Sequence, residues 1–224
     1  MPKVTSVEAQ KNNPRRFNIF LDGTFAFGAD EDLVVNRRLI VGKDISSAEL
    51  PKLLFEAEAG KLMESMYALF SRRQRAEKEV RDYFRRKNRE RKVKGQEPIS
   101  DLMIEEVIAA LKRKGLVDDV LFARSWVEAR RRSKRKGRIA LKIELFRKGI
   151  SREIVDKTLQ EAGGEEDEKI LARQALEKKL RVWSALPYPE KKGKALHFLL
   201  RRGFEYSVAS DTVDKLIKKE YTNS

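Results

Sequence analysis

Residues 114–122 have the sequence KGLVDDVLF, which contains both the end of one helix and the start of the next. Gly115 follows a basic dipeptide and can adopt the left-handed conformation that ends a helix. Asp118 is placed to cap the next helix, with Val117 and Phe122 on either side of it as a hydrophobic staple. The stretch therefore predicts two short helices joined by a tight turn.

The same start and stop signals recur along the chain. Ser100 and Ser151 are predicted caps with an apolar residue before and after them, and Gly149 and Gly203 are predicted helix stops. Between these signals the apolar residues have helical spacing, and we expect them to form the core. The predicted core residues on three of these helices are Ile104, Val107, Ile108 and Leu111; Phe122, Trp126 and Ala129; and Ile139, Ile143 and Phe146.

An internal repeat is visible in the second half of the chain. Residues 145–150 are LFRKGI and match residues 199–204, LLRRGF, with a weaker copy at residues 80–87, VRDYFRRK. This pattern predicts helical units of roughly fifty residues that stack as an elongated array. The predicted units are residues 66–117, 118–163 and 164–224. The basic segment 88–98, with its Gly and Pro, is expected to be an exposed loop inserted in the first unit.

A small β-module is predicted before the helical units. Asp22-Gly23 lies between two aromatic and β-branched runs, which is a strong signal for a two-residue hairpin turn. With Val4–Gln10 as a third strand, the module is expected to cover residues 1–45. Leu33–Leu39 could form a short helix, and Ser46 or Ser47 is expected to cap a linking helix over residues 46–65.

Positive charge is concentrated in two segments. The chain has 50 Lys and Arg against 35 Asp and Glu, a formal charge of +15. Residues 71–94 carry twelve cations and four carboxylates, and residues 124–148 carry eleven and two, so the rest of the chain is close to neutral. A basic patch of this kind favours nucleic acid as a partner. The alternative is that each run is a solvated helix end, where cations complement the helix dipole.

Several classes of protein are disfavoured by composition. There is no cysteine, which excludes disulfides and thiolate chemistry. No apolar run is long enough for a membrane span and the first residues do not resemble a signal peptide, so we expect a cytoplasmic protein. The single histidine, His197, is expected to be structural, and the acidic residues 165–168 to complement a helix dipole. The sequence thus predicts no catalytic residue, metal, cofactor or small-molecule substrate.

Three stretches carry a resemblance to a known family. They are residues 76–80 after Arg72-Arg73, residues 114–127 (KGLVDDVLFARSWV), and residues 137–159 with Gly137, Ile139, Glu144, Leu145, Lys148, Gly149, Ile150, Val155 and Leu159. Together they resemble the RecX regulatory proteins, over about residues 69–216. Asp118 and Asp119 match the acidic pair of that family, and we interpret Asp118 as a helix cap rather than a metal ligand. The insertion at 88–98 departs from its compact members.

The resemblance implies a mainly α protein of three tandem three-helix repeats after a β-module. It implies a noncatalytic protein that binds the RecA filament and DNA, lodges in the filament groove, and damps filament growth, ATP hydrolysis and strand exchange. The candidate contacts to RecA or DNA are then Arg72, Arg73, Arg75, Lys78, Arg130, Arg131, Arg132, Lys134, Arg135, Lys136 and Arg138. The alternative is a stand-alone DNA- or RNA-binding protein without sequence preference. A repeat array with polar ends is expected to be a monomer.

Overall fold

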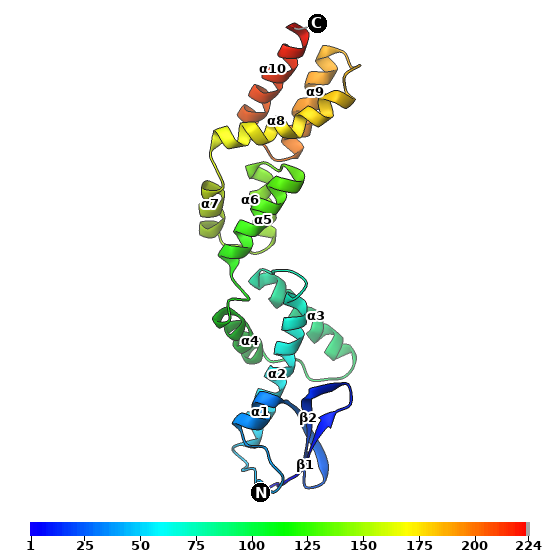
Figure 1. Ribbon diagram of the computed structural model, residues 1–224, viewed down its shortest axis with the longest axis vertical. Coiled ribbons are helices and arrows are strands. Elements are labelled where there is room, and N and C mark those ends of the chain that lie inside the picture. The colour runs from blue at the N-terminus through cyan, green and yellow to red at the C-terminus, as the bar shows by residue number, and fades with distance from the viewer. Residues whose placement is uncertain (223–224) are drawn as a thin grey trace. The chain divides into compact units, whose positions relative to one another are not determined.

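The computed structural model describes residues 1–222, with side chains as far as Ile217. The strands are β1 (Val4–Gln10), β2 (Asn13–Leu21) and β3 (Thr24–Asp30). The helices are α1 (Glu31–Asn36), α2 (Leu50–Phe70), α3 (Glu77–Val93), α4 (Asp101–Arg113), α5 (Asp119–Lys134), α6 (Arg138–Arg147), α7 (Arg152–Glu161), α8 (Glu165–Val182), α9 (Tyr188–Arg201) and α10 (Tyr206–Thr222) (Figure 1). The predicted order, a small β-module followed by helices, is confirmed.

The chain forms two compact units. The first contains residues 1–74 and 83–117, and the second contains residues 75–82 and the chain from Asp118 onward. Helix α3 contributes to both, because its first residues belong to the second unit and the remainder to the first.

The first unit begins with an antiparallel sheet of order β1-β2-β3. Asp22 and Gly23 both have positive φ, 48° and 81°, as the predicted hairpin turn requires. Helix α1 begins earlier than expected, because the Asp30 carboxylate accepts a hydrogen bond from the Leu33 N–H at 2.8 Å and caps it. Helix α2 packs beside the sheet (Figure 1), and the two elements share one apolar core.

Helix α2 starts and ends later than the sequence indicated. The Ser46 hydroxyl accepts from the Glu49 N–H at 3.1 Å, but it does so in the turn before the helix. The first helical residues are Leu50 and Pro51, and proline is favoured there because the first turn has no use for its missing N–H. The prediction that Ser46 or Ser47 caps this helix is therefore wrong, because the cap position is occupied by Glu49.

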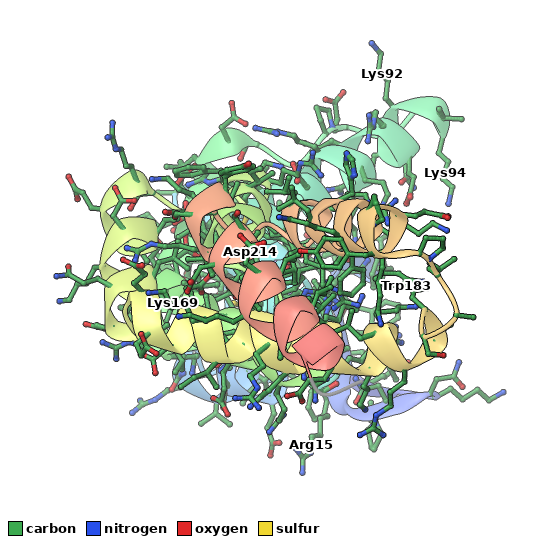
Figure 2. All side chains as sticks on the ribbon, turned by 90° about the horizontal axis from the view of Figure 1, so that it is seen from above. Arg15, Lys92, Lys94, Lys169, Trp183 and Asp214 are labelled. Atoms are coloured by element: carbon green, nitrogen blue, oxygen red, sulfur yellow. The ribbon has the colours of Figure 1, made fainter. Side chains whose placement is uncertain are left out.

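The segment 88–98 is only partly a loop, which corrects the prediction. Helix α3 continues through good helix formers to Val93. The first residue after it with a left-handed conformation is Gly95, with φ 66°. The Asn88 amide closes the turn, since it donates to the Ile99 carbonyl at 2.9 Å and accepts from the Ile99 N–H at 2.8 Å. Figure 2 shows Lys92 and Lys94 projecting outward from this region.

The caps and stops predicted for the helices after α3 are confirmed. The side chains of Ser100, Asp118 and Ser151 each accept a hydrogen bond from a backbone N–H in the first turn of the helix that follows. Gly115 and Gly149 have φ of 67° and 82°. These signals are local, so they could be recognised without knowledge of the tertiary fold.

In the second unit, α5–α7 and α8–α10 each surround a core of their own. The first core contains Phe122, Ala123, Val127, Leu141, Leu145, Ile150, Val155 and Leu159, together with Ala76 from the chain before α3. The second contains Ala172, Leu176, Leu180, Ala195, Leu199, Phe204, Val208, Ala209, Val213 and Ile217. Trp183 packs against this second core, with its ring 5.9 Å from that of Phe198.

The expected core face of α6 is wrong. Ile139, Ile143 and Phe146 are 45%, 46% and 41% exposed, whereas Leu141 and Leu145 are fully buried. Both sets have helical spacing and both are apolar, so periodicity could not decide between them. Ala129 of α5 is also exposed.

Gly137 and Gly203 lie where the group α5–α7 contacts the group α8–α10, and the two backbones approach closely there. The Gly137 N–H donates to the Arg202 carbonyl and the Ile139 N–H to the Gly203 carbonyl, both at 2.9 Å. A Cβ atom on Gly137 would lie 2.5 Å from the Gly203 oxygen. A similar approach occurs earlier in this unit, where a Cβ on Gly149 would lie 2.6 Å from the Lys78 Cβ. In both places the turn after one helix rests on the start of an earlier helix.

Candidate nucleic-acid and protein interface

The cations of residues 130–138 face different surroundings at the end of α5. Some are bound by carboxylates within the fold, and others are exposed. Because only exposed cations can contact a partner, the position of each one decides which can belong to an interface.

Arg130 and Lys136 are bound around Trp126. The Arg130 guanidinium lies 4.2 Å from the centre of the indole ring, and its Nε lies 3.0 Å from Glu144. Glu144 also accepts from the Trp126 Nε1–H at 2.8 Å and pairs with Lys136. Although burial opposes it, the hydrogen bonds from Lys136 and Trp126 lower the pKa of Glu144. This cluster stabilises the packing of α5 on α6.

Arg131 forms the most deeply buried ion pair of this region. Its Nη2 lies 2.6 Å from Glu168, and the two side chains are only 12% and 5% exposed. Arg138 contributes its backbone N–H, which donates to Glu168 at 3.0 Å. Burial raises the pKa of Glu168, against the opposing effects of the Arg138 N–H and the Arg131 charge. Arg131 thus links α5 to α8.

The acidic residues 165–168 do more than complement a helix dipole. Glu165 and Glu166 are exposed at the start of α8, and Asp167 accepts a hydrogen bond from the Gly164 N–H at 2.9 Å. These three fit the predicted helix-end role. Glu168 instead points into the junction between the two three-helix groups as the partner of Arg131.

Three cations at the end of α5 remain available, and we call Arg132, Lys134 and Arg135 the α5 cation end. The Arg132 side chain is 78% exposed, and within residues 1–217 its one ion-pair contact is a long one of 3.9 Å to Glu128. Lys134 is exposed, and Arg135 is partly exposed. Within residues 1–217, neither of these two has a carboxylate within ion-pair distance.

Arg135 has two further features that indicate a special position. It adopts the left-handed conformation, with φ 46° and ψ 54°, and its buried Nε has no hydrogen-bond partner among the residues that the structure describes. Burial, together with the charge of Arg135, lowers the pKa of Arg202. Two like charges held close together are unfavourable unless an anion binds between them or nearby. Strained backbone of this kind is commonly found at functional sites.

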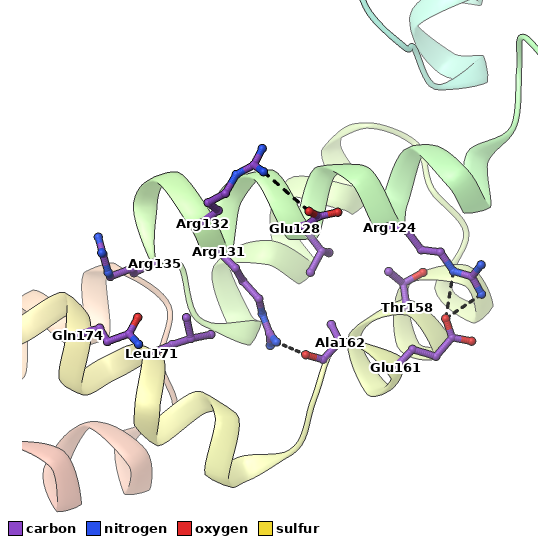
Figure 3. A pocket seen from close by; sticks show the side chains of 11 residues that line it. Arg124, Glu128, Arg131, Arg132, Arg135, Thr158, Glu161, Ala162, Leu171 and Gln174 are labelled. Atoms are coloured by element: carbon purple, nitrogen blue, oxygen red, sulfur yellow. Dashed lines mark hydrogen bonds and ion pairs between the residues drawn. The ribbon is translucent and has the colours of Figure 1, made fainter.

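A cavity of about 660 Å³ adjoins the α5 cation end, between α5, α7 and α8 (Figure 3). Figure 3 shows Arg131 reaching from α5 to the Ala162 carbonyl, and Arg124 reaching Glu161, whose carboxylate lies 2.9 Å from the Arg124 Nη2. The residues that line it are Arg124, Val127, Glu128, Arg131, Arg132, Arg135, Thr158, Glu161, Ala162, Leu171 and Gln174. It therefore combines arginines with an apolar floor.

The earlier candidates are divided between the two compact units. Arg72 and Arg73 are exposed in the first unit, and Arg73 donates to the Gln74 carbonyl. Arg75 and Lys78 belong to the second unit, where Lys78 pairs with Asp82 at 3.1 Å. The role of all eleven candidate cations in binding stays a prediction.

Sequence reasoning missed the carboxylates that bind the arginines and the apolar floor of the cavity. One signal was available, because Arg124, Glu128, Arg131 and Arg135 follow helical spacing and therefore share a face of α5. Nothing in the local sequence indicated that Glu144 and Glu168 would be the partners, since both come from other helices.

Within the part of the chain that the structure describes, no group of three or more His, Asp or Glu side chains could hold a metal ion. His197 is exposed, and its Nδ1 lies 3.0 Å from the Gly193 carbonyl of its own helix. In the same described range, every helix is too short or too polar to cross a membrane.

Comparison with known proteins gives three family-model matches. They are the regulatory protein RecX N-terminal domain at residues 2–46, the second three-helix domain of RecX at 118–159 and the third at 166–213. Regulatory protein RecX of Bacillus subtilis (strain 168) is 32% identical over 226 residues, covering all of this chain and 79% of that protein. The chain belongs to the RecX family. Both the predicted family and the predicted fold of tandem three-helix repeats are confirmed.

Other RecX proteins also match the chain. Regulatory protein RecX of Bacillus pumilus (strain SAFR-032) is 31% identical, covering 98% of this chain and 99% of that protein. A crystal structure of regulatory protein RecX has a TM-score of 0.69 at 25% identity and covers 98% of this chain and 100% of the other. The crystal structure of RecX from Lactobacillus salivarius has a TM-score of 0.60, also at 25% identity. The match covers 70% of this chain and 96% of that one. The RecX relatives are named regulatory proteins.

Proposed function

We propose that this protein regulates the RecA recombinase without catalysing a reaction. It binds RecA filaments on DNA in the cytoplasm and restrains filament growth, ATP hydrolysis and strand exchange. Membership of the RecX family supports this function. The single observation that carries it is the α5 cation end, a group of exposed cations in the second three-helix domain.

The α5 cation end provides the contacts to phosphate in this proposal. Arg130, Arg131 and Lys136 are occupied by Glu144 and Glu168, so they act by holding α5 in place. Arg72, Arg73, Arg75, Lys78 and Arg138 remain further candidates. A nucleoprotein filament presents both phosphates and acidic side chains, and arginine binds either of them with paired hydrogen bonds.

The direct test is the ATPase activity of RecA on single-stranded DNA. Added at substoichiometric amounts, this protein is expected to slow ATP hydrolysis, because each bound copy blocks further growth of a filament. The rate is measured with and without the protein at a fixed salt concentration. An unchanged rate across all ratios would reject the proposed function.

Removing the three charges of the α5 cation end is expected to weaken DNA binding by roughly tenfold. The variant is Arg132→Ala/Lys134→Ala/Arg135→Ala, and the dependence of log affinity on log salt should become shallower by about 2.7. The matched control is Arg89→Ala/Lys92→Ala/Lys94→Ala, which removes three exposed charges from the end of α3. Equal losses of DNA affinity in the two variants would show that only the net charge of the protein matters. That result would contradict a specific role for the α5 cation end.

Replacing Arg135 with glycine is expected to separate stability from binding. Glycine adopts the left-handed conformation without the cost that arginine has, so Arg135→Gly should raise the free energy of unfolding by about 1 kcal/mol. The same change removes a phosphate contact and should weaken DNA binding severalfold. Urea unfolding and fluorescence anisotropy measure the two effects. A variant that is more stable and still binds DNA with full affinity would remove Arg135 from the interface.

The second candidate is a stand-alone nucleic-acid-binding protein without sequence preference. The formal charge of +15 favours it. It requires tight binding to DNA or RNA alone and no effect on RecA beyond competition for the strand. Raising the DNA concentration would then abolish the inhibition, whereas a RecA-directed regulator would retain it.

A further inference from the structure

The cavity beside α5 has two kinds of wall. The buried Val127 and the half-buried Ala162 and Leu171 provide an apolar floor. The exposed part of the lining, the rim, is charged and contains Arg124, Arg132, Glu128 and Glu161. Its volume of about 660 Å³ lies within the range of pockets that hold small organic groups, roughly 300–1,000 Å³. Two members of the α5 cation end, Arg132 and Arg135, also line the cavity. A phosphate held by these side chains would therefore lie next to an apolar recess.

We propose that this cavity accepts one unstacked base of single-stranded nucleic acid, while Arg132 and Arg135 bind the adjoining phosphate. The inference rests on the proposed function, because it assigns the form of nucleic acid recognised at that same site. It gives the protein a preference for single strands over duplexes.

The chemistry of the walls favours a base over a phosphate alone. A phosphate needs cations and gains nothing from an apolar floor, whereas a base can bury its flat face there. Guanidinium groups add to this, since arginine planes stack on unpaired bases. Bases in a duplex stay stacked on their neighbours, so a duplex would contact the rim and leave the floor empty.

The wall is also fixed before any ligand arrives. Arg131 is held by Glu168 and by the Ala162 carbonyl, so this side of the cavity does not depend on a mobile side chain. On the other side, Arg124 is held by Glu161 through two hydrogen bonds, at 3.1 and 2.9 Å. A preformed recess loses less conformational entropy when it binds a base.

The test compares an oligothymidylate with a hairpin duplex of equal length, each labelled for anisotropy. Wild-type protein is expected to bind the single strand about tenfold more tightly, within the range attributed to one buried base. Ala162→Leu fills the floor without changing charge, and it should remove most of this preference while leaving duplex affinity within about twofold. Ala129→Leu makes the same substitution at an exposed position of α5 outside the cavity and should behave as wild type.

A second readout reports the base directly. A single 2-aminopurine in the oligonucleotide should brighten when wild-type protein removes it from its neighbours, and should not brighten with Ala162→Leu. Circular dichroism checks the fold of each variant. If Ala162→Leu misfolds, Ala162→Val replaces it, because valine adds less volume at the same position of the cavity lining.

The possible results distinguish this inference from the proposed function. Equal wild-type affinity for both DNAs, or filled variants that keep the full preference, would overturn the base site. Filled variants that bind DNA normally but no longer inhibit RecA would also overturn it, and would indicate a protein segment as the occupant. A single-strand preference that is lost on filling, in a protein with no effect on RecA, would support the base site and reject only the proposed function.

Discussion

Replacing Gly203 with alanine is expected to lower the free energy of unfolding by about 3 kcal/mol. Gly203 has φ 84°, and a side chain in this left-handed conformation costs about 1 kcal/mol. The new Cβ would also lie 2.3 Å from both the Ala140 Cβ and the Ala140 backbone nitrogen. Backbone cannot move aside as a flexible side chain would, so this overlap adds about 2 kcal/mol. Urea unfolding monitored by circular dichroism measures the total.

Gly115 provides the matched control for this substitution. It has φ 67°, but a Cβ there would meet nothing within 4 Å. Gly115→Ala should therefore lower the free energy of unfolding by only about 1 kcal/mol, the cost of a side chain in the left-handed conformation. Equal losses in the two variants would mean that the Gly203 turn does not rest on α6 in solution as it does in the structure.

The second large effect is expected from Glu168. Glu168→Ala should lower the free energy of unfolding by about 3 kcal/mol, because Arg131 would keep a buried charge without a partner. The Arg138 N–H would lose its acceptor as well. The exposed Glu166, two residues earlier on the same helix, is the control, and Glu166→Ala should change stability by less than about 0.5 kcal/mol.

Glu168 also gives stability a dependence on pH with a defined sign. Its pKa is raised in the folded protein, so the unfolded chain loses this proton first as pH rises above about 4.5. The contribution of Glu168 is therefore greatest below pH 4.5 and falls as pH rises through its folded pKa. Glu168→Gln, which cannot ionise, should remove that fall. A wild-type profile that this substitution leaves unchanged would contradict the raised pKa.

The sequence was most informative where structure is set by neighbouring residues. Asp118 and Gly115 could be assigned as cap and stop, and Asp22-Gly23 as a hairpin turn, because each role depends on a few adjacent residues. The exposed face of α6 could not be predicted. Ile139 and Leu141 are equally apolar, and only the packing of α6 on its neighbours decides which of them is buried.

The sequence predicted where positive charge is concentrated in the candidate site. It did not predict which of these side chains are buried and which are exposed. Counting cations located residues 130–138, yet it treated Arg131 and Arg132 as equivalent. The structure separates them, since Arg131 is buried against Glu168 and Arg132 is exposed. That difference arises from a carboxylate 37 residues away along the chain, which no local pattern could have indicated.

Each three-helix group of the second unit contains one of the two tryptophans of the chain. Trp126 contacts the core of α5–α7, with Arg130 and Lys148 over its ring, and Trp183 contacts the core of α8–α10. The protein thus carries a built-in optical probe for each group. Replacing either indole with phenylalanine would leave the emission of the other to report whether the two groups melt together or one after the other.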